Sequence, residues 1–360
     1  MSGSSQGAAE VHGRGIEIVA HRGSGRDYPA PVGIQAHRPA APPENTLPAF
    51  RWGWARGRAC ELDVHLTRDG KVIVIHDGTT GRTCDRDLTV GTSSLDELRR
   101  LDAGVKKGPM WQGLRLPTLR EVLDAMPPGG RLYVEAKNGP GIVAPLLAEI
   151  AAAGKGADQI VFISFSIDTI SALKRARPEL TCYWILVFDE LKPGLWRAGY
   201  DRTEDDNLTF RTIWQQPVDY AELLALARND DYRLDGLDVS FQQPDDFAAA
   251  MRQAGMPWGA WAVDDGDLAV LMARKGAIQI TSNCADDIWG ALAHPATPAW
   301  PPARTKLVGA PGEGASPSPP EGREGDRGVA GGDPIDASSR PGSSRSRAPG
   351  WLTGGTDLDS

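Results

Sequence analysis

The chain has 360 residues, 41% of them hydrophobic, and a formal net charge of −8, a length that suits one large domain or two small ones. The negative balance argues against a nucleic-acid or anionic-membrane surface, where Lys and Arg dominate. No apolar run reaches the roughly 18 residues of a membrane span, and the first 15 residues lack the apolar core of a signal peptide. The four cysteines lie far apart and form no zinc or disulfide pattern. We therefore expect a cytoplasmic protein.

Composition divides the chain into three parts. Residues 1–13 and 296–360 are rich in small and polar residues and nearly free of large apolar side chains. Such segments cannot bury enough surface to offset the entropy of ordering, so we expect both to be disordered. The part between them, residues 14–295, has the length of one α/β barrel domain.

Within residues 14–295, short apolar runs alternate with amphipathic helical patterns. The expected strands are 17–21, 60–66, 71–76, 131–137, 159–165, 182–188, 236–241, 258–263 and 278–282. The expected helices are 44–57, 117–126, 141–154, 167–176, 244–255 and 265–276. Repeated strand–helix units predict a parallel sheet with helices outside it. Eight or nine strands over this length favour a closed (β/α)8 barrel of the TIM type above an open doubly wound sheet, and no Gly-x-Gly-x-x-Gly follows the first strand.

An Asp-Gly pair at residues 69–70 predicts a β-hairpin between the second and third strands, because Asp-Gly suits a two-residue type I′ turn. That turn places Asp63 opposite His76. Since side chains alternate along a strand, one face is expected to carry Leu62, Val64, Leu66, Ile73 and Ile75. The other is expected to carry Glu61, Asp63, His65, Val72, Val74 and His76. This second face is either an ordinary hairpin surface in water or part of a site, because two carboxylates and two imidazoles are unusual on a water-facing strand.

The strand 131–137 adds a third carboxylate. Its residues Tyr133, Glu135 and Lys137 share one face. If Glu135 meets Glu61 and Asp63 inside one barrel mouth, the repulsion among them requires a cation. Three carboxylates without a cysteine are hard oxygen ligands, which suit Mg²⁺ or Ca²⁺ better than zinc. The set therefore predicts a divalent metal site.

Ten short motifs, in this order, resemble those of the glycerophosphodiester phosphodiesterase family. They are AHRG (20–23), PENT (43–46), ELDVHLTRDG (61–70), VIVIHD (72–77), GRT (81–83), PTL (117–119), VEAK (134–137), SFS (164–166), WAVDD (261–265) and ITSNCADD (280–287). Each is weak alone, but the ordered set is specific. The resemblance spans nearly all of residues 14–295, and it implies the family's somewhat irregular (β/α)8 barrel, in agreement with the expected strands.

The resemblance also implies a role for each matching residue. Glu44 matches a residue near the metal, although a first-turn carboxylate favoured by the helix dipole is an equal alternative. Trp261 matches a tryptophan lining the glycerol end of the pocket, whereas core packing is the more common fate of a strand tryptophan. The remaining implied residues are His21 and His76 as general acid and base, Glu61, Asp63 and Glu135 as ligands of Mg²⁺ or Ca²⁺, and Arg22 and Lys137 on the phosphate.

The implied reaction is metal-dependent hydrolysis of a small-molecule glycerophosphodiester to sn-glycerol 3-phosphate and an alcohol. A rival activity is that of a lysophospholipase D or sphingomyelinase D, which uses the same histidines and metal. Such an enzyme requires an exposed apolar rim that receives acyl chains, and Trp196 and Trp214 are candidates for it. A rival of another class is a catalytically silent barrel that binds phosphodiesters as a sensor. Retention of both histidines and all three acids speaks against that rival.

The chain departs from the family pattern in two segments. Residues 24–42 form a long insertion with a second Ala-His-Arg, which makes His37 an alternative to His21. Two prolines and a glycine before His37 are poor material for a central strand, so we favour His21. Residues 190–217 form an irregular stretch that follows a strand, and we expect it to lie on the catalytic face of the barrel.

Overall fold

The computed structural model describes residues 15–23, 41–192, 195–198, 201–202, 208–209, 214–215 and 218–293. The disorder predicted for residues 1–13 and 296–360 concerns segments outside the described residues, as does the alternative histidine His37. The domain boundaries at residues 14 and 295 stay predictions. No helix in the described part of the chain is both long and apolar enough to cross a bilayer.

Eight parallel strands close into a barrel. Around the ring, each strand pairs with the next in the order β1-β14-β13-β12-β6-β5-β4-β2, and β1 also pairs with β2. The strands are β1 (Glu17–Ala20), β2 (Ala59–Leu66), β4 (Leu132–Ala136), β5 (Ile160–Ser164), β6 (Thr181–Leu186), β12 (Gly236–Ser240), β13 (Trp258–Trp261) and β14 (Gln279–Ser282). The TIM-type barrel predicted from the sequence is therefore confirmed.

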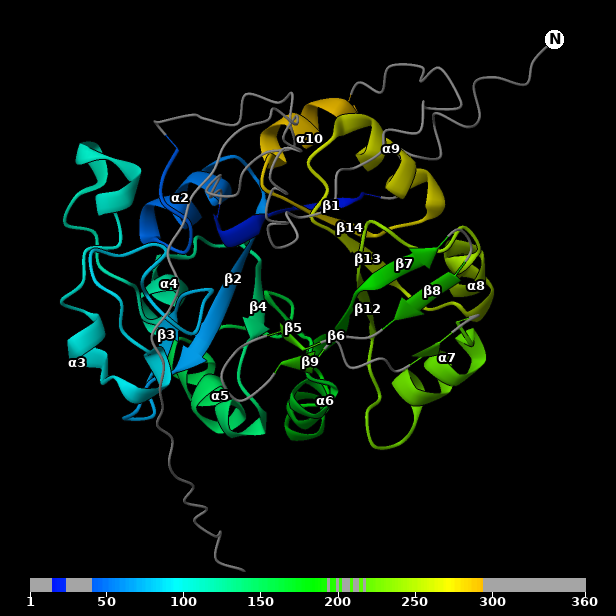
Figure 1. Cartoon of the computed structure of the whole chain (residues 1–360), viewed down its shortest axis with the longest axis horizontal. Coiled ribbons are helices and arrows are strands. Elements are labelled where there is room, and N and C mark those ends of the chain that lie inside the picture. Colours follow the sequence, from blue (N-terminus) through cyan, green and yellow to red (C-terminus); the bar gives the residue numbers. More distant parts are fainter. Residues whose placement is uncertain are drawn as a thin grey trace, which may run out of the picture. The chain divides into compact units, whose positions relative to one another are not determined.

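Helices surround this ring (Figure 1). They are α2 (Leu47–Ala55), α4 (Leu119–Ala125), α5 (Val143–Ala152), α6 (Ile167–Ala176), α7 (Tyr220–Arg228), α8 (Phe247–Ala254), α9 (Gly266–Lys275) and α10 (Ala285–Ala293), with the short α3 (Leu95–Leu98) in the segment after the second strand. All six expected helices are present. Two further helices, α7 and α10, were not expected from the sequence, although Asp219, which caps the first turn of α7, was an available signal for one of them.

Two apolar layers hold the barrel together. Side chains that point outward from the strands pack under the helices, among them the fully buried Phe162 and Trp184. Inside the ring a smaller cluster includes Val19, Tyr133 and Tyr183. Tyr133 lies two residues before Glu135 on β4, so it fills the barrel below the carboxylate and polar groups lie toward the carboxyl ends of β2 and β4. This is the end at which TIM barrels carry their active sites.

The hairpin of β2 and β3 (Val72–Val74) exists, but its predicted register was wrong by one residue. His65 pairs with Ile73, and Val64 pairs with Val74. The turn is a three-residue loop closed at Thr67 and Lys71, in which Gly70 has a φ of 69°, a common alternative to the two-residue turn. A slip of one residue reverses the faces of a strand.

The reversed faces change the surroundings of β3. Val72 and Val74 pack with Leu62 and Val64 in the main core. Ile73 and Ile75, which were expected on that face, instead pack in a separate cluster with Leu98 and Leu101 near α3. His76 lies just beyond the strand rather than within it.

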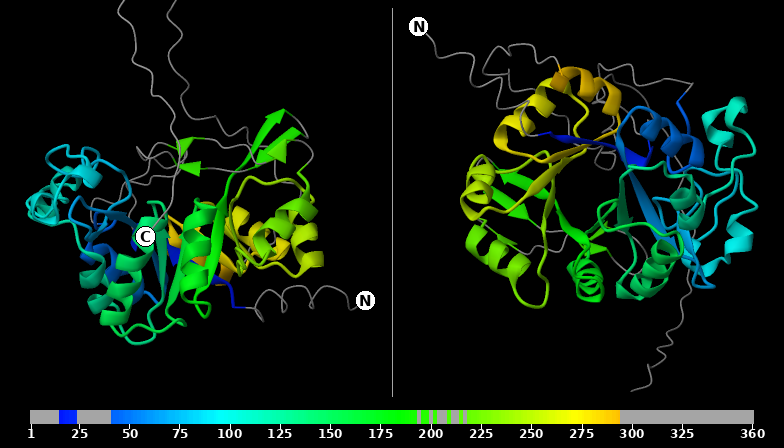
Figure 2. Two further views of the ribbon diagram at one scale, coloured as in Figure 1. Left: turned by 90° about the horizontal axis from the view of Figure 1, so that it is seen from below. Right: turned by 180° about the vertical axis from the view of Figure 1, so that it is seen from behind.

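The stretch 190–217 was expected to be irregular, and this was wrong for its described part. β7 (Phe188–Lys192) and β8 (Leu195–Ala198) form an antiparallel pair, which β11 (Trp214–Gln215) extends, while β9 (Asp201–Arg202) pairs with β10 (Leu208–Thr209). Figure 2 shows the β7–β8 pair rising beyond the barrel as a continuation of β6. In the sequence, the Pro-Gly pair at residues 193–194, between β7 and β8, was the available turn signal for this hairpin.

One glycine is required where the first strand turns into the site. Gly23 has a φ of 91°, and a Cβ there would lie 2.8 Å from the backbone of Ala49 and of Phe50 in α2. We expect Gly23→Ala to lower the free energy of unfolding by about 2–4 kcal/mol, through left-handed strain and overlap with a helix backbone. Urea unfolding checks this. Gly91→Ala is the control, since Gly91 has open space and no left-handed φ, and it should change stability by under about 0.5 kcal/mol. Equal effects of the two substitutions would contradict the account.

Candidate active site

Three carboxylates meet at the carboxyl end of neighbouring strands. Glu61 and Asp63 lie two residues apart on β2, so both point into the barrel, and Asp63 pairs in register with Glu135 on β4. One ligand oxygen from each lies within 4.8 Å of the others. All three side chains are buried. The convergence expected from the alternation of the two strands is therefore present.

This acid cluster has the charge imbalance of a cation site. Glu61 Oε1 is buried and has no hydrogen-bond partner among the described residues. Burial and the charges of Asp63 and Glu135 raise the pKa of Glu61 well above its usual range. The Lys137 ammonium contacts Glu135 and lies 2.7 Å from Asp63 Oδ1. Lys137, even with Arg22, which Asp63 shares with Glu44, does not balance three carboxylates, so the set fits a hard divalent ion such as Mg²⁺ or Ca²⁺.

Asp63 differs from Glu61 in its partners. Burial opposes ionisation, but the charges of Lys137 and other neighbours hold the pKa of Asp63 well below its usual range. Its Oδ2 accepts a hydrogen bond of 2.8 Å from the Asn45 side chain, and the Arg22 Nε lies 3.6 Å away. Asn45 comes from the PENT motif, so that motif supports the acid cluster directly.

His21 is held by an amide from the other end of the chain. Its Nδ1 lies 2.7 Å from Asn283 Oδ1, and Asn283 donates to Asp264 through both its backbone N and its Nδ2, each at 2.8 Å. Burial and the charge of Arg22 lower the pKa of His21 to about 4. A neutral ring that donates from Nδ1 leaves Nε2 as the acceptor, and this atom lies 3.9 Å from Glu61 Oε2.

His76 is also held through its Nδ1, but by a carboxylate instead of an amide. Its Nδ1 lies 2.5 Å from Asp77 Oδ1, and Arg82 Nε donates to Asp77 Oδ2 at 2.6 Å. Burial and the charge of Lys137 lower the pKa of His76 to about 3. Buried His65 donates from Nε2 to the backbone oxygen of His76, 3.0 Å away, so it supports the segment that carries His76.

Glu44 lies between two guanidinium groups. Its Oε1 accepts from Arg22 at 2.8 Å, and Arg82 binds both of its oxygens at 2.8 and 2.7 Å. Burial opposes ionisation, but Arg82 and Arg22 lower the pKa of Glu44 to about 2. Glu44 precedes α2, which begins at Leu47, so it is not a first-turn helix carboxylate. It is also outside the three-acid cluster, and the structure places it as a partner of Arg22.

Both histidines, both cations and two of the three carboxylates line one cavity of about 230 Å³ inside the mouth of the barrel. Trp261 lines this cavity from β13, packs edge-on against Phe165 with ring centroids 5.8 Å apart, and donates from Nε1 to the backbone oxygen of Asp238. It is therefore part of the cavity wall rather than core filling. The lining residues are His21, Arg22, Glu61, His76, Glu135, Lys137, Ile163, Phe165, Ile185, Asp238, Trp261, Ala262, Thr281 and Asn283.

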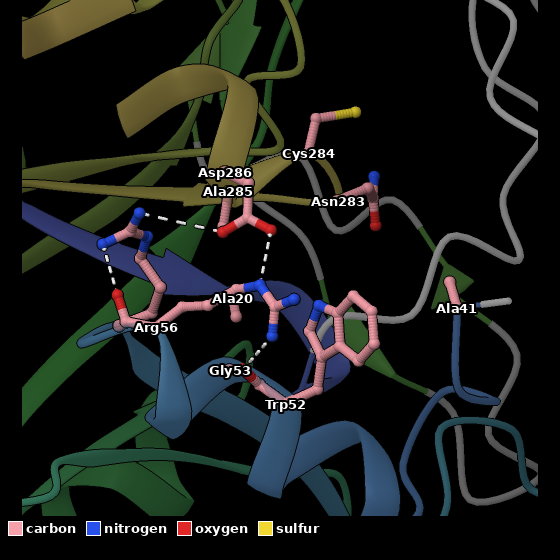
Figure 3. Close-up of a pocket in the computed structure, with 10 residues that line it drawn as sticks. Ala20, Ala41, Trp52, Gly53, Arg56, Asn283, Cys284, Ala285 and Asp286 are labelled. Carbon is pink, nitrogen blue, oxygen red and sulfur yellow. Dashed lines mark hydrogen bonds and ion pairs between the residues drawn. The ribbon is translucent and has the colours of Figure 1, made fainter. Parts of the chain in front are cut away.

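A second hollow lies outside the barrel between α2 and α10. Figure 3 shows Arg56 and Asp286 facing one another across it, with 3.0 Å between Arg56 Nε and Asp286 Oδ2. Trp52 stacks under the Arg56 guanidinium at 3.7 Å. Its charges are paired and it holds no acid cluster, so we place the chemistry in the barrel mouth.

Four functional positions were missed in the sequence. Asn283, Asp264 and Arg82 anchor the histidines, and Asp238 lines the cavity. The first three stand inside quoted motifs, at ITSNCADD, WAVDD and GRT, so their polar residues were the available signal. Asp238 stands in an otherwise apolar strand, GLDVS, where a lone carboxylate is itself unusual.

Comparisons with known proteins agree with this geometry. The sequence model of the "Glycerophosphoryl diester phosphodiesterase family" matches residues 21–286. A glycerophosphodiester phosphodiesterase of Caldanaerobacter subterraneus subsp. tengcongensis is 33% identical over 169 residues, which are 45% of this chain and 63% of that protein. One of Bacillus subtilis is 31% identical over 170 residues, 42% of this chain and 58% of that protein. The alignments thus span less than two thirds of either relative.

Solved structures share the fold. A phosphodiesterase from Oleispira antarctica, in complex with the product sn-glycerol-3-phosphate, has a TM-score of 0.60 and 22% identity, over 79% of this chain and 99% of that chain. A glycerophosphodiester phosphodiesterase from Thermotoga maritima has a TM-score of 0.52 and 19% identity, over 77% and 98%. At these sequence identities, the structural similarity establishes the barrel fold alone.

Asp238 gives a test of the electrostatics of the cavity. Burial raises the pKa of Asp238 to about 8, against about 3.9 in an unfolded chain. Between these values the native state binds a proton that the unfolded state lacks, so stability falls as pH rises. Relative to Asp238→Asn, the free energy of unfolding of the wild type should fall by up to about 1.4 kcal/mol per pH unit between pH 5 and 8. Urea unfolding measures this difference. The control is Asp245→Asn, at an exposed position on the following loop, which should change the free energy of unfolding by under about 0.5 kcal/mol. A pH-independent difference between wild type and Asp238→Asn would contradict the prediction.

Proposed function

The chain belongs to the glycerophosphoryl diester phosphodiesterase family, and from that premise we propose that it hydrolyses glycerophosphodiesters to sn-glycerol 3-phosphate and an alcohol. The observation that carries the proposal is the meeting of three buried carboxylates, two anchored imidazoles and two cations around one cavity. The substrate is a small molecule, since the cavity of about 230 Å³ is of the size of a small phosphodiester rather than a polymer.

Glu61, Asp63 and Glu135 would hold one divalent cation, Mg²⁺ or Ca²⁺. When bound, such an ion lowers the pKa of a substrate hydroxyl and stabilises charge on the phosphoryl oxygens. The orphaned Glu61 Oε1 and the raised pKa of Glu61 support this assignment. Lys137 contacts the same carboxylates, so it is placed to neutralise a phosphate oxygen beside them.

Hydrolysis of a phosphodiester needs one group that accepts a proton and one that donates it. We assign these steps to His21 and His76. Each ring has its Nδ1 anchored by an oxygen, which leaves Nε2 for proton transfer. Arg22 offers a planar guanidinium to the phosphate, and its binding to Glu44 fixes its position. Trp261, on the cavity wall, would line the glycerol end.

The rival activities have less support. A lysophospholipase D or sphingomyelinase D needs an exposed apolar rim, and Trp196 packs partly buried against the core, while the side chain of Trp214 lies outside the described residues. A silent phosphodiester sensor has no need for two anchored imidazoles beside an acid cluster. A cytoplasmic location stays a prediction from the sequence.

The central test removes each imidazole in turn. We expect His76→Ala and His21→Ala to lower kcat for glycerophosphocholine roughly 10²–10⁴-fold, the usual contribution of a general acid or base. Metal binding, measured by calorimetry, should be retained in His76→Ala. His37→Ala is the matched control and should keep wild-type activity. Activity that survives in His21→Ala but is lost in His37→Ala would transfer the role to His37.

Arg82 should act as a positioning residue, because one guanidinium holds both Asp77 and Glu44. Arg82→Ala releases the anchor of His76 together with one anchor of Glu44. We expect kcat/KM to fall roughly 10–100-fold, as for other groups that orient catalytic ligands, with partial rescue in Arg82→Lys. The control is Arg86→Ala, on the same loop, whose Nε lies 3.9 Å from Asp85. If Arg82→Ala is as active as Arg86→Ala, the network has no role in catalysis.

A further inference from the structure

A carboxyl group that none of these steps uses lines the far side of the cavity. Asp238 lies on β12, four strands from β2 in either direction round the ring, and therefore opposite Glu61 and Asp63. It is 2% exposed and faces the cavity. Among the described residues no basic side chain forms an ion pair with it, and its one hydrogen-bond donor is the Gln279 amide.

Three residues from the next two strands fix this carboxyl group. Gln279 Nε2 donates to Asp238 Oδ1 at 2.6 Å. Thr281 Oγ1 donates to Gln279 Oε1 at 3.1 Å, which orients the amide with its nitrogen toward Asp238. Gly259 makes the contact possible, because a Cβ there would lie 1.8 Å from Gln279 Nε2. One oxygen of Asp238 is thus held by protein, and Oδ2 is left for the cavity.

The surroundings of Asp238 suit an alcohol better than an ion. Burial, with a smaller contribution from the charge of Glu135, raises the pKa of this carboxyl to about 8, which favours its neutral form. A neutral carboxyl both donates and accepts hydrogen bonds, as a hydroxyl does. The neighbouring wall is apolar, with Ile163, Ile185 and Trp261, which suits the carbon chain of a small polyol.

The position of Asp238 on the strand opposite β2 decides which hydroxyl is in reach. Arg22 and Lys137 lie on the β1, β2 and β4 side, where the phosphate is placed by the proposed function. An arm that leaves the phosphate and crosses the cavity ends beside β12. In a glycerol arm the middle hydroxyl stays near phosphorus, and the terminal hydroxyl is the group that reaches the far wall.

We propose that Asp238 is a specificity-determining residue that hydrogen-bonds the terminal hydroxyl of the substrate's glycerol arm. This inference rests on the proposed function and narrows its substrate class to phosphodiesters in which the buried arm ends in a hydroxyl. Gln279, Thr281 and Gly259 position the carboxyl, and Trp261 packs beside the carbon chain.

The test compares two substrates that differ in this hydroxyl alone: sn-glycero-3-phosphocholine, and the 1,2-propanediol analogue that keeps the middle hydroxyl. Wild-type kcat/KM should favour the glycerol substrate roughly 10- to 100-fold, the effect of leaving one buried polar group unpaired. In Asp238→Ala the preference should fall to near one, because only the glycerol substrate loses a contact. Asp238→Asn, which keeps hydrogen-bonding capacity, should retain part of it. Asp245→Ala should keep the full preference.

Two results would overturn the inference. The first is an equal rate for both substrates in the wild type. The second is a preference that survives in an Asp238→Ala protein with unchanged melting temperature. If the wild type hydrolyses neither substrate, the proposed function fails. Calorimetric binding of sn-glycerol 3-phosphate against 1,2-propanediol phosphate, in wild type and Asp238→Ala, then still decides the role of Asp238.

Discussion

The site depends on like charges held together where water cannot screen them. Glu61, Asp63 and Glu135 are buried within 4.8 Å of one another, and burial of unpaired carboxylates is costly. The barrel makes the arrangement possible, because parallel pairing of β2 with β4 places Asp63 and Glu135 side by side. The surrounding cations offset part of this cost. The raised pKa of Glu61 shows that they do not neutralise all of the negative charge.

The reacting groups are positioned by partners from distant parts of the chain. His21, at the end of the first strand, is held by Asn283, after the last strand, with Asp264 behind it. The pairing of β1 with β14 brings these ends together. His76 is held by Asp77 and Arg82, and Arg82 reaches Glu44 and so Arg22. Both imidazoles and the Arg22 guanidinium, which is proposed to bind the phosphate, therefore depend on the closure of the barrel and on one loop network.

Much of this arrangement is accessible from the sequence because it depends on local periodicity. The alternation of β2 and β4 placed Glu61, Asp63 and Glu135 on inward faces, and the strand–helix repeats predicted the barrel. The β3 register was not accessible, since Asp-Gly fits a two-residue and a three-residue turn almost equally well, and only packing of Ile73 against Leu101 and its neighbours selects one. Asp238 was missed for a related reason: its position in the cavity is fixed by a Gln279 side chain that crosses Gly259, a contact between strands that no short motif encodes.

The central claim is that the three carboxylates bind one divalent cation beside the imidazoles. Its most direct test is a calorimetric titration of the wild type and of Glu61→Gln with Mg²⁺ and with Ca²⁺. The account predicts one bound ion per wild-type chain and loss of that binding in a folded Glu61→Gln protein, where a neutral amide replaces the least compensated ligand. Absence of binding in the wild type, or equal binding by both proteins, would contradict it.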